Sequence, residues 1–117
     1  MSTLSGKRIF LVEDEAIVAL MVEDMLAELD ATVVGPALTI ANGLALAQSE
    51  EIDAAVLDVN VRGERIDPVA EVLRARKVPI VFATGYGDGA GEIAREAPVL
   101  DKPYTREKLA TTLARLL

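Results

Sequence analysis

Five short, continuously apolar runs recur along the chain, and stretches long enough for a helix separate most neighbouring runs. The runs read RIFLV, ATVVG, AAVLD, PIVFAT and APVLD. Because apolar and polar residues do not alternate within a run, each run predicts a strand that is buried on both faces. Strands that alternate with helices predict right-handed crossovers. We therefore expect an α/β fold with a doubly wound five-stranded parallel sheet.

Helical periodicity fills the stretches between the runs. Between the first and second runs, apolar residues recur at helical spacing while acids occupy other positions of the helical wheel. The expected inward positions are Val18, Val22, Met25 and Leu29. The segment LTIANGLALAQ carries Ile40, Leu44 and Ala47 at helical spacing despite Gly43. Each segment predicts an amphipathic helix that covers the sheet.

Capping signals predict where the later helices begin. Asp67 precedes Pro68, which predicts an acceptor at the N-cap and proline at the first helical position. Thr105 is placed to cap a C-terminal helix. The stretch after GYGDGAG is the least distinct helix, because its glycines lower helix propensity.

Composition and charge narrow the range of chemistries. The chain has 117 residues, a net charge of −7, no cysteine and no histidine. The acidic balance argues against nucleic acid as a partner and favours a basic partner or a cation. Thiolate metal sites, imidazole bases and disulfides are excluded. No apolar run reaches the roughly 18 residues of a membrane-spanning helix, so we expect a cytoplasmic protein without membrane contact.

Polar side chains follow four of the five predicted strands. In an open parallel sheet, ligands bind where the carboxyl ends of the strands meet a switch in strand order. The polar residues at these ends are Glu13, Asp14, Glu15, Asp58, Thr84, Asp101 and Lys102. The sequence therefore predicts a ligand site at this edge of the sheet.

Asp14 and Asp58 form the sharpest pair among these residues. Two carboxylates at the tips of neighbouring strands repel each other unless a divalent cation lies between them, and oxygen ligands favour Mg²⁺. Lys102 suits a phosphoryl oxygen as a point charge, and the Thr84 hydroxyl suits it as a donor. Taken singly, each residue also has an ordinary structural explanation, as a capping acid, a surface lysine or a turn threonine.

Over its whole length the chain resembles the receiver domain of two-component response regulators. The matching motifs are LVEDE, VLDVNVRG, FATGY and LDKPY, each at the end of its own predicted strand. The resemblance implies a flavodoxin-like (βα)5 fold with strand order 2-1-3-4-5. The sequence FATGY resembles the motif of the receiver subgroup known as FAT GUY.

The resemblance also assigns roles to the residues. It implies that Asp58 is the phosphoacceptor, which takes a phosphoryl group from a histidine kinase or a histidine phosphotransfer protein. It implies that Asp14, Asp58 and the backbone carbonyl of Asn60 bind Mg²⁺, and that Glu13 assists through water. Thr84 and Lys102 then contact the phosphoryl group. Such a domain is a signalling module rather than an enzyme, with at most slow self-catalysed phosphoryl transfer and dephosphorylation.

One position departs from the receiver pattern. Val99 stands three residues before Lys102, where many receivers have a switching tyrosine or phenylalanine. Tyr86, which follows the FATG sequence, is the candidate to replace that aromatic side chain. Tyr86 equally fits a half-buried ring that packs over the glycine loop.

Three alternatives remain open at the level of sequence. GYGDGA satisfies the pattern G-x-G-x-x-A of dinucleotide-binding loops, although that motif ordinarily follows the first strand of its unit. An aspartyl-phosphate hydrolase also uses aspartate and magnesium, but Asn60 cannot serve it as a general acid. A degenerate receiver would signal through contacts alone.

We expect residues 1–117 to form a single receiver domain, with no output domain in this chain. The readout of such a domain is a downstream protein partner, a homodimer or a region outside this sequence. A phosphorylation-dependent change of surface would carry the signal.

Overall fold

The computed structural model describes residues 4–85 and 97–117, and a five-stranded parallel sheet runs through its centre. In spatial order the strands are β2 (Thr32–Ala37), β1 (Arg8–Val12), β3 (Ala54–Asp58), β6 (Ile80–Thr84) and β7 (Val99–Asp101). Counted along the chain, this is the order 2-1-3-4-5. The predicted sheet is therefore confirmed.

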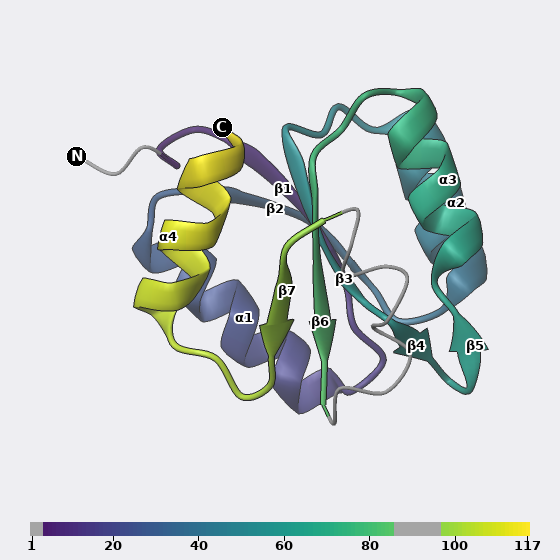
Figure 1. Cartoon of the computed structure of the whole chain (residues 1–117), viewed down its shortest axis with the longest axis horizontal. Helices are drawn as coiled ribbons and strands as arrows, with labels where there is room; N and C mark the ends of the chain where they lie inside the picture. The colour runs from purple at the N-terminus through teal and green to yellow at the C-terminus, as the bar shows by residue number, and fades with distance from the viewer. Residues whose placement is uncertain (1–3, 86–96) are drawn as a thin grey trace.

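The described helices cover both faces of this sheet. They are α1 (Ala16–Glu28), α2 (Ile40–Ser49), α3 (Asp67–Ala75) and α4 (Arg106–Leu116). Figure 1 shows α1 and α4 together on one face, and α2 and α3 together on the other. Among the described residues, no helix is long and apolar enough to cross a membrane. The helix expected after GYGDGAG lies outside the described residues.

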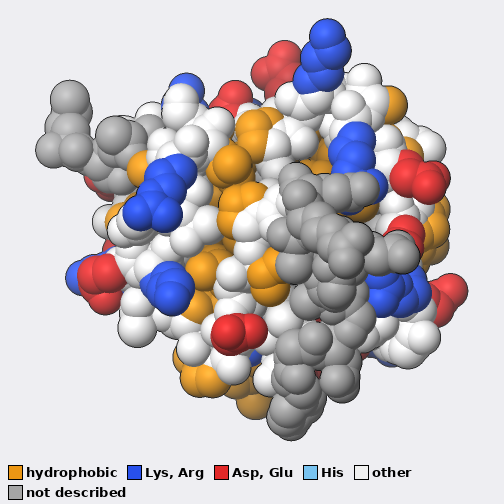
Figure 2. All heavy atoms as spheres, in the orientation of Figure 1, with side chains coloured by type: hydrophobic (Ala, Val, Ile, Leu, Met, Phe, Trp, Pro, Cys, Tyr) orange, Lys and Arg blue, Asp and Glu red, His pale blue; other side chains and the backbone are white. Residues whose placement is uncertain are grey.

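The inward stripe of helix α1 is the predicted one, with two further residues. Val22 is buried, and Val18, Met25 and Leu29 are partly buried against the core of the α1 and α4 face. Ala19 and Leu26 share this face of the helix and are buried as well. Three apolar side chains at the start of α1 are exposed: Ile17, Leu20 and Met21. Hydrophobic atoms are visible at the lower edge of Figure 2, where Figure 1 places that end of α1.

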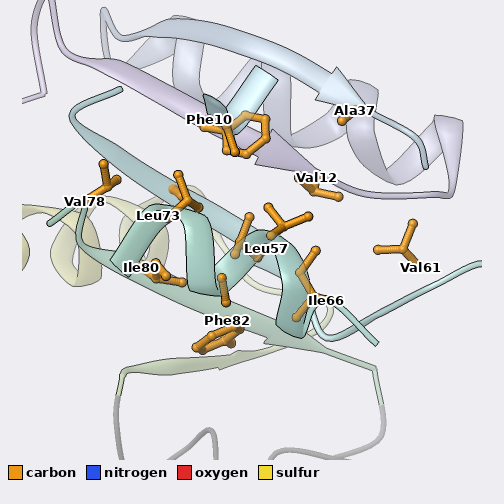
Figure 3. Packing of buried hydrophobic residues seen from close by; sticks show 14 of the residues in the cluster. Phe10, Val12, Ala37, Leu57, Val61, Ile66, Leu73, Val78, Ile80 and Phe82 are labelled. Carbon is orange, nitrogen blue, oxygen red and sulfur yellow. The ribbon is translucent and has the colours of Figure 1, made fainter. Parts of the chain in front are cut away.

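Two hydrophobic cores lie on the two faces of the sheet, because successive side chains of each strand point to opposite faces. Phe10, Leu57 and Phe82 pack in the core covered by helices α2 and α3. Figure 3 shows them together with Leu73 of α3. Leu11 and Val56, at alternate positions, pack with helices α1 and α4. The continuous apolarity of the strands is thus explained by burial on both sides.

Threonine caps two of the described helices, and the cap at Thr105 is the predicted one. The hydroxyl of Thr39 accepts a hydrogen bond from the Asn42 amide at 3.1 Å, and the hydroxyl of Thr105 accepts one from Lys108 at 3.1 Å. The prediction that Asp67 is an N-cap is wrong. Helix α3 begins at Asp67 itself, whose carboxylate instead pairs with the Arg65 guanidinium at 3.4 Å.

A short antiparallel hairpin follows β3 and was not anticipated. Strand β4 (Asn60–Val61) pairs with β5 (Glu64–Arg65) before the chain enters α3. A strand of two residues is too short to show a period in the sequence, so no pattern of apolar positions indicates it.

Candidate functional site

Four strands of the sheet end at one groove. Asp58 is the last residue of β3 and Thr84 the last of β6, while Glu13 and Asp14 directly follow β1. Strands β1 and β3 are neighbours, and so are β3 and β6, so these residues meet at one edge. A groove of about 580 Å³ opens there, and Asp14, Asp58, Thr84 and Lys102 line it.

The carboxylates of Glu13, Asp14 and Asp58 form a tight acidic cluster. One oxygen from each lies within 4.8 Å of the others. Glu13 is only 3% exposed and Asp58 only 8% exposed, so water cannot fully screen their repulsion. Each acid is held by its surroundings: Glu13 accepts a hydrogen bond from the Glu15 amide at 3.0 Å, and Asp14 accepts one from the Arg62 amide at 2.8 Å.

Lys102 is the cation that faces this cluster from β7. Its ammonium donates to Glu13 and lies 3.2 Å from Oδ2 of Asp58. The lysine follows the last residue of a strand two places away from β3 in the sheet, so only a long side chain can reach the acids. Its backbone amide donates to the Thr84 carbonyl at 2.9 Å, which fixes where the side chain starts.

Burial and charge shift the acid equilibria of the site. Burial, together with the negative charge of Glu13, raises the pKa of Asp58 to about 7 although Lys102 opposes the shift. Burial alone would also raise the pKa of Asp14, but hydrogen bonds, first of all from the Arg62 amide, hold it below its ordinary value. Burial would lower the pKa of Lys102, yet its contacts with Glu13 and Asp58 raise it, so the lysine stays charged.

The structure brings together most of the predicted site residues. Glu13, Asp14, Asp58, Thr84 and Lys102 meet as expected, and Asn60 lines the same groove. Asp101 is exposed at the end of β7 and is not among the described residues that line the groove. Tyr86 lies outside the described residues, and Val99 is partly buried against the core of the α2 and α3 face.

Sequence reasoning missed two residues that border the site. Tyr104 is half-buried and lines the groove, and burial, followed by the negative charges of Glu13 and Asp58, raises its pKa above the ordinary value. Its place two residues after Lys102 is the signal that could have drawn attention to it. Arg62 contacts Asp14 through its backbone amide, and no pattern of side chains in the sequence predicts that contact.

The donor set fits a hard divalent cation. Three carboxylates offer oxygen ligands within a small radius, and no histidine or cysteine exists anywhere in the chain to favour a softer metal. When all three acids are ionised, they carry three negative charges. The Lys102 ammonium in contact with Glu13 and Asp58 carries a single positive charge. A cation such as Mg²⁺ would relieve this excess of negative charge.

Comparison with solved structures identifies the family. SdrG from Sphingomonas melonis Fr1 is 49% identical, with 99% of this chain and 98% of SdrG covered at a TM-score of 0.85. A receiver protein of a response regulator from Sinorhizobium medicae WSM419 is 28% identical, with 97% and 96% covered at a TM-score of 0.83. The chain belongs to the receiver domains of response regulators. Neither a protein-family profile nor a curated protein matches it.

Two further structures bear on the chemistry of such receiver domains. The receiver domain of the sensor histidine kinase PA1611 from Pseudomonas aeruginosa PAO1 has a magnesium ion coordinated in its active-site cleft. It is 27% identical, with 96% of this chain and 98% of that chain covered at a TM-score of 0.83. SdrG has also been solved in a BeF3-activated conformation, 48% identical over the full length of both chains at a TM-score of 0.79. The FATGY spelling and the likeness to SdrG are consistent with the FAT GUY subgroup.

Proposed function

We propose that this receiver domain accepts a phosphoryl group on Asp58 from a phosphohistidine donor, in a reaction that depends on Mg²⁺. The observation that carries the proposal is the position of Asp58. It ends the central strand β3, lies at the groove and is surrounded by Glu13, Asp14 and Lys102. A nucleophile at that position reaches an incoming group while its neighbours supply charges of both signs.

In this proposal Mg²⁺ is held by Asp14, Asp58 and the backbone carbonyl of Asn60, with Glu13 assisting through water. The closeness of the three carboxylates supports the assignment, as does the place of Asn60 in the groove. The ion supplies charge neutralisation when bound, which lets a carboxylate and a phosphoryl group approach each other.

The transfer step needs little from the protein beyond position and charge. A carboxylate oxygen of Asp58 attacks phosphorus, the bond from phosphorus to the histidine nitrogen breaks, and that nitrogen keeps the electron pair. The ammonium of Lys102, already 3.2 Å from Asp58, is placed to pair with an equatorial oxygen of the phosphoryl group. In the same proposal the hydroxyl of Thr84, at the end of the neighbouring strand β6, donates a hydrogen bond to another equatorial oxygen.

Transmission of the signal is assigned to Thr84 and Tyr86. Val99 replaces the aromatic side chain that switches in many receivers, and it packs against the core of the α2 and α3 face. We propose that Tyr86 takes the signalling role and that the changed surface binds a downstream protein or a second copy. A cytoplasmic location, a single-domain organisation and slow self-dephosphorylation belong to the same proposal.

Phosphorylation by acetyl phosphate tests the proposal directly. We expect Mg²⁺ and acetyl phosphate to add one phosphoryl group to the wild-type chain, detected by intact mass, and no group to Asp58→Asn. Asp53→Asn, at an acid five residues earlier that hydrogen-bonds the Arg8 amide, should be labelled like the wild type. Labelling of Asp58→Asn would contradict the assignment of the acceptor, and rapid turnover of acetyl phosphate would favour a hydrolase.

A further inference from the structure

The hairpin between β3 and α3 turns through two residues of positive φ. Arg62 has φ of 52° and Gly63 has φ of 81°, and they connect β4 to β5. Positive φ at both central residues is typical of the tight turns that suit the twist of antiparallel strands. Arginine rarely adopts this conformation, so the surrounding structure must hold it there.

Buried side chains on both sides of the turn hold the hairpin in place. Val61 and Ile66 are fully buried in the core of the α2 and α3 face, where Figure 3 labels both. The Ile66 amide donates to the Val59 carbonyl at 2.9 Å, which closes the base of the hairpin. The hairpin is therefore attached to the core by Val61 in β4 and by Ile66, which directly follows β5.

The turn directs one backbone amide at the acidic cluster. The N–H of Arg62 donates to Oδ2 of Asp14 at 2.8 Å, across 48 positions of sequence. The guanidinium Nε donates to the Leu38 carbonyl at 3.2 Å, directly after β2, so the side chain and the backbone amide of Arg62 have different partners. The contact with Asp14 thus depends on the backbone conformation and not on the identity of the side chain.

We propose that the turn Arg62–Gly63 is a positioning element for the Mg²⁺ ligand Asp14. The Arg62 amide holds one carboxylate oxygen and restricts rotation of the group, so less freedom is lost when the cation binds. This inference rests on the proposed function, in which Asp14 is a ligand. The hairpin also begins at Asn60, so one short element would supply one ligand and orient another.

Gly63→Ala tests the turn, and Gly6→Ala is its matched control. Gly63 and Gly6 have φ of 81° and 75°, and an added Cβ meets nothing within 4 Å at either position. Both variants therefore carry the same backbone strain without a steric clash, but only Gly63 belongs to the turn that holds Asp14. In calorimetric titrations with Mg²⁺, we expect roughly tenfold weaker binding for Gly63→Ala, as for the loss of other groups that orient metal ligands. Gly6→Ala should bind like the wild type.

A second pair of variants separates the backbone from the side chain. Arg62→Asn and Arg62→Val both remove the guanidinium and keep the N–H, but asparagine tolerates positive φ and a β-branched valine does not. We expect Arg62→Asn to keep wild-type Mg²⁺ affinity and Arg62→Val to weaken it.

The outcomes distinguish this inference from the proposed function. Equal Mg²⁺ affinity of wild type, Gly63→Ala and Arg62→Val would overturn the role of the turn and leave Asp58 phosphorylation standing. Equal weakening in Gly6→Ala and Gly63→Ala would also overturn it, because strain alone would then explain the loss. A wild-type chain that binds no Mg²⁺ would contradict the proposed function itself. Circular dichroism of each variant checks that it is folded.

Discussion

At the scale of single residues, the site holds buried carboxylates close together, and their repulsion lowers the stability of the fold. Asp58 is buried next to Glu13, and its pKa is raised to about 7 because burial and the negative charge of Glu13 disfavour the ionised carboxylate. Asp58 therefore binds more protons in the folded chain than in the unfolded chain between about pH 4 and 7. The stability that comes from its protonated form is fully present below about pH 4 and is lost as the pH rises to about 7.

Asp58→Asn should make the metal-free protein more stable. The amide carries no charge, and Lys102 is not left unpaired, because it keeps its contact with Glu13. In EDTA at pH 8, we expect the free energy of unfolding to rise by roughly 1–3 kcal/mol, with a smaller gain at pH 5. Urea denaturation followed by circular dichroism measures both values.

Asp24→Asn is the control for this prediction, because Asp24 is an exposed acid on α1. It lowers the net negative charge by the same amount without touching the cluster. An equal gain in both variants would show that overall charge repulsion, and not the burial of Asp58, is responsible.

At the scale of elements, the ends of strands and helices determine where the chemistry lies. Parallel strands bring their carboxyl ends to one edge, which places Asp58 and Thr84 on adjoining strands. Helix α4 starts three residues after Pro103, and its N-cap Thr105 accepts a hydrogen bond from the Lys108 amide. The cap thus stabilises the helix that follows the site residue Lys102.

Thr105→Ala should destabilise the protein through the end of α4. Loss of the hydrogen bond from the Lys108 amide removes one cap, which costs about 1 kcal/mol. Thr111→Ala, in the exposed middle of the same helix, should be neutral or slightly stabilising, because alanine has the higher helix propensity. Equal stability of the two variants in urea denaturation would contradict the capping role of Thr105.

At the scale of the whole molecule, an apolar surface adjoins the groove. Ile17, Leu20 and Met21 are 77%, 57% and 49% exposed on one face of α1, and Met21 also lines the groove that holds Asp58. Large exposed apolar side chains grouped in this way commonly mark a surface for another protein. Under the proposed function, the phosphohistidine donor reaches Asp58 through this groove, so we propose that it contacts this face of α1.

Ile17→Ser should slow phosphorylation by a protein donor and leave labelling by acetyl phosphate unchanged. Loss of apolar contact in the complex predicts transfer that is roughly fivefold slower from a histidine kinase that labels the wild-type chain. Leu117→Ser, at an exposed apolar residue that directly follows α4, is the control and should transfer normally. Equal transfer rates for Ile17→Ser and the wild type would remove α1 from the donor surface.

Much of the fold and the site could be predicted because the evidence for them is local. The continuous runs at Phe10, Leu57 and Phe82 show their burial directly, since a strand covered on both faces has no polar position. The cap at Thr105 is predicted by residue type, because threonine is favoured at helix N-caps. The strand-end residues could be placed together because parallel topology gathers carboxyl ends at one edge. The N-cap of α3 was misplaced by one residue, at Asp67, because the boundary of a helix depends on local backbone geometry that residue type alone does not fix.

The alternation of strands and helices, the acidic character and the residues at the strand ends can all be read from the sequence, since they depend on periodicity and residue type. Which oxygen meets which donor depends on the folded arrangement of the chain. Lys102 crosses two strands to reach Glu13, and the Arg62 amide reaches Asp14 from a hairpin far along the chain. Such contacts depend on backbone conformation and on the mutual placement of distant segments, and no local pattern encodes either one.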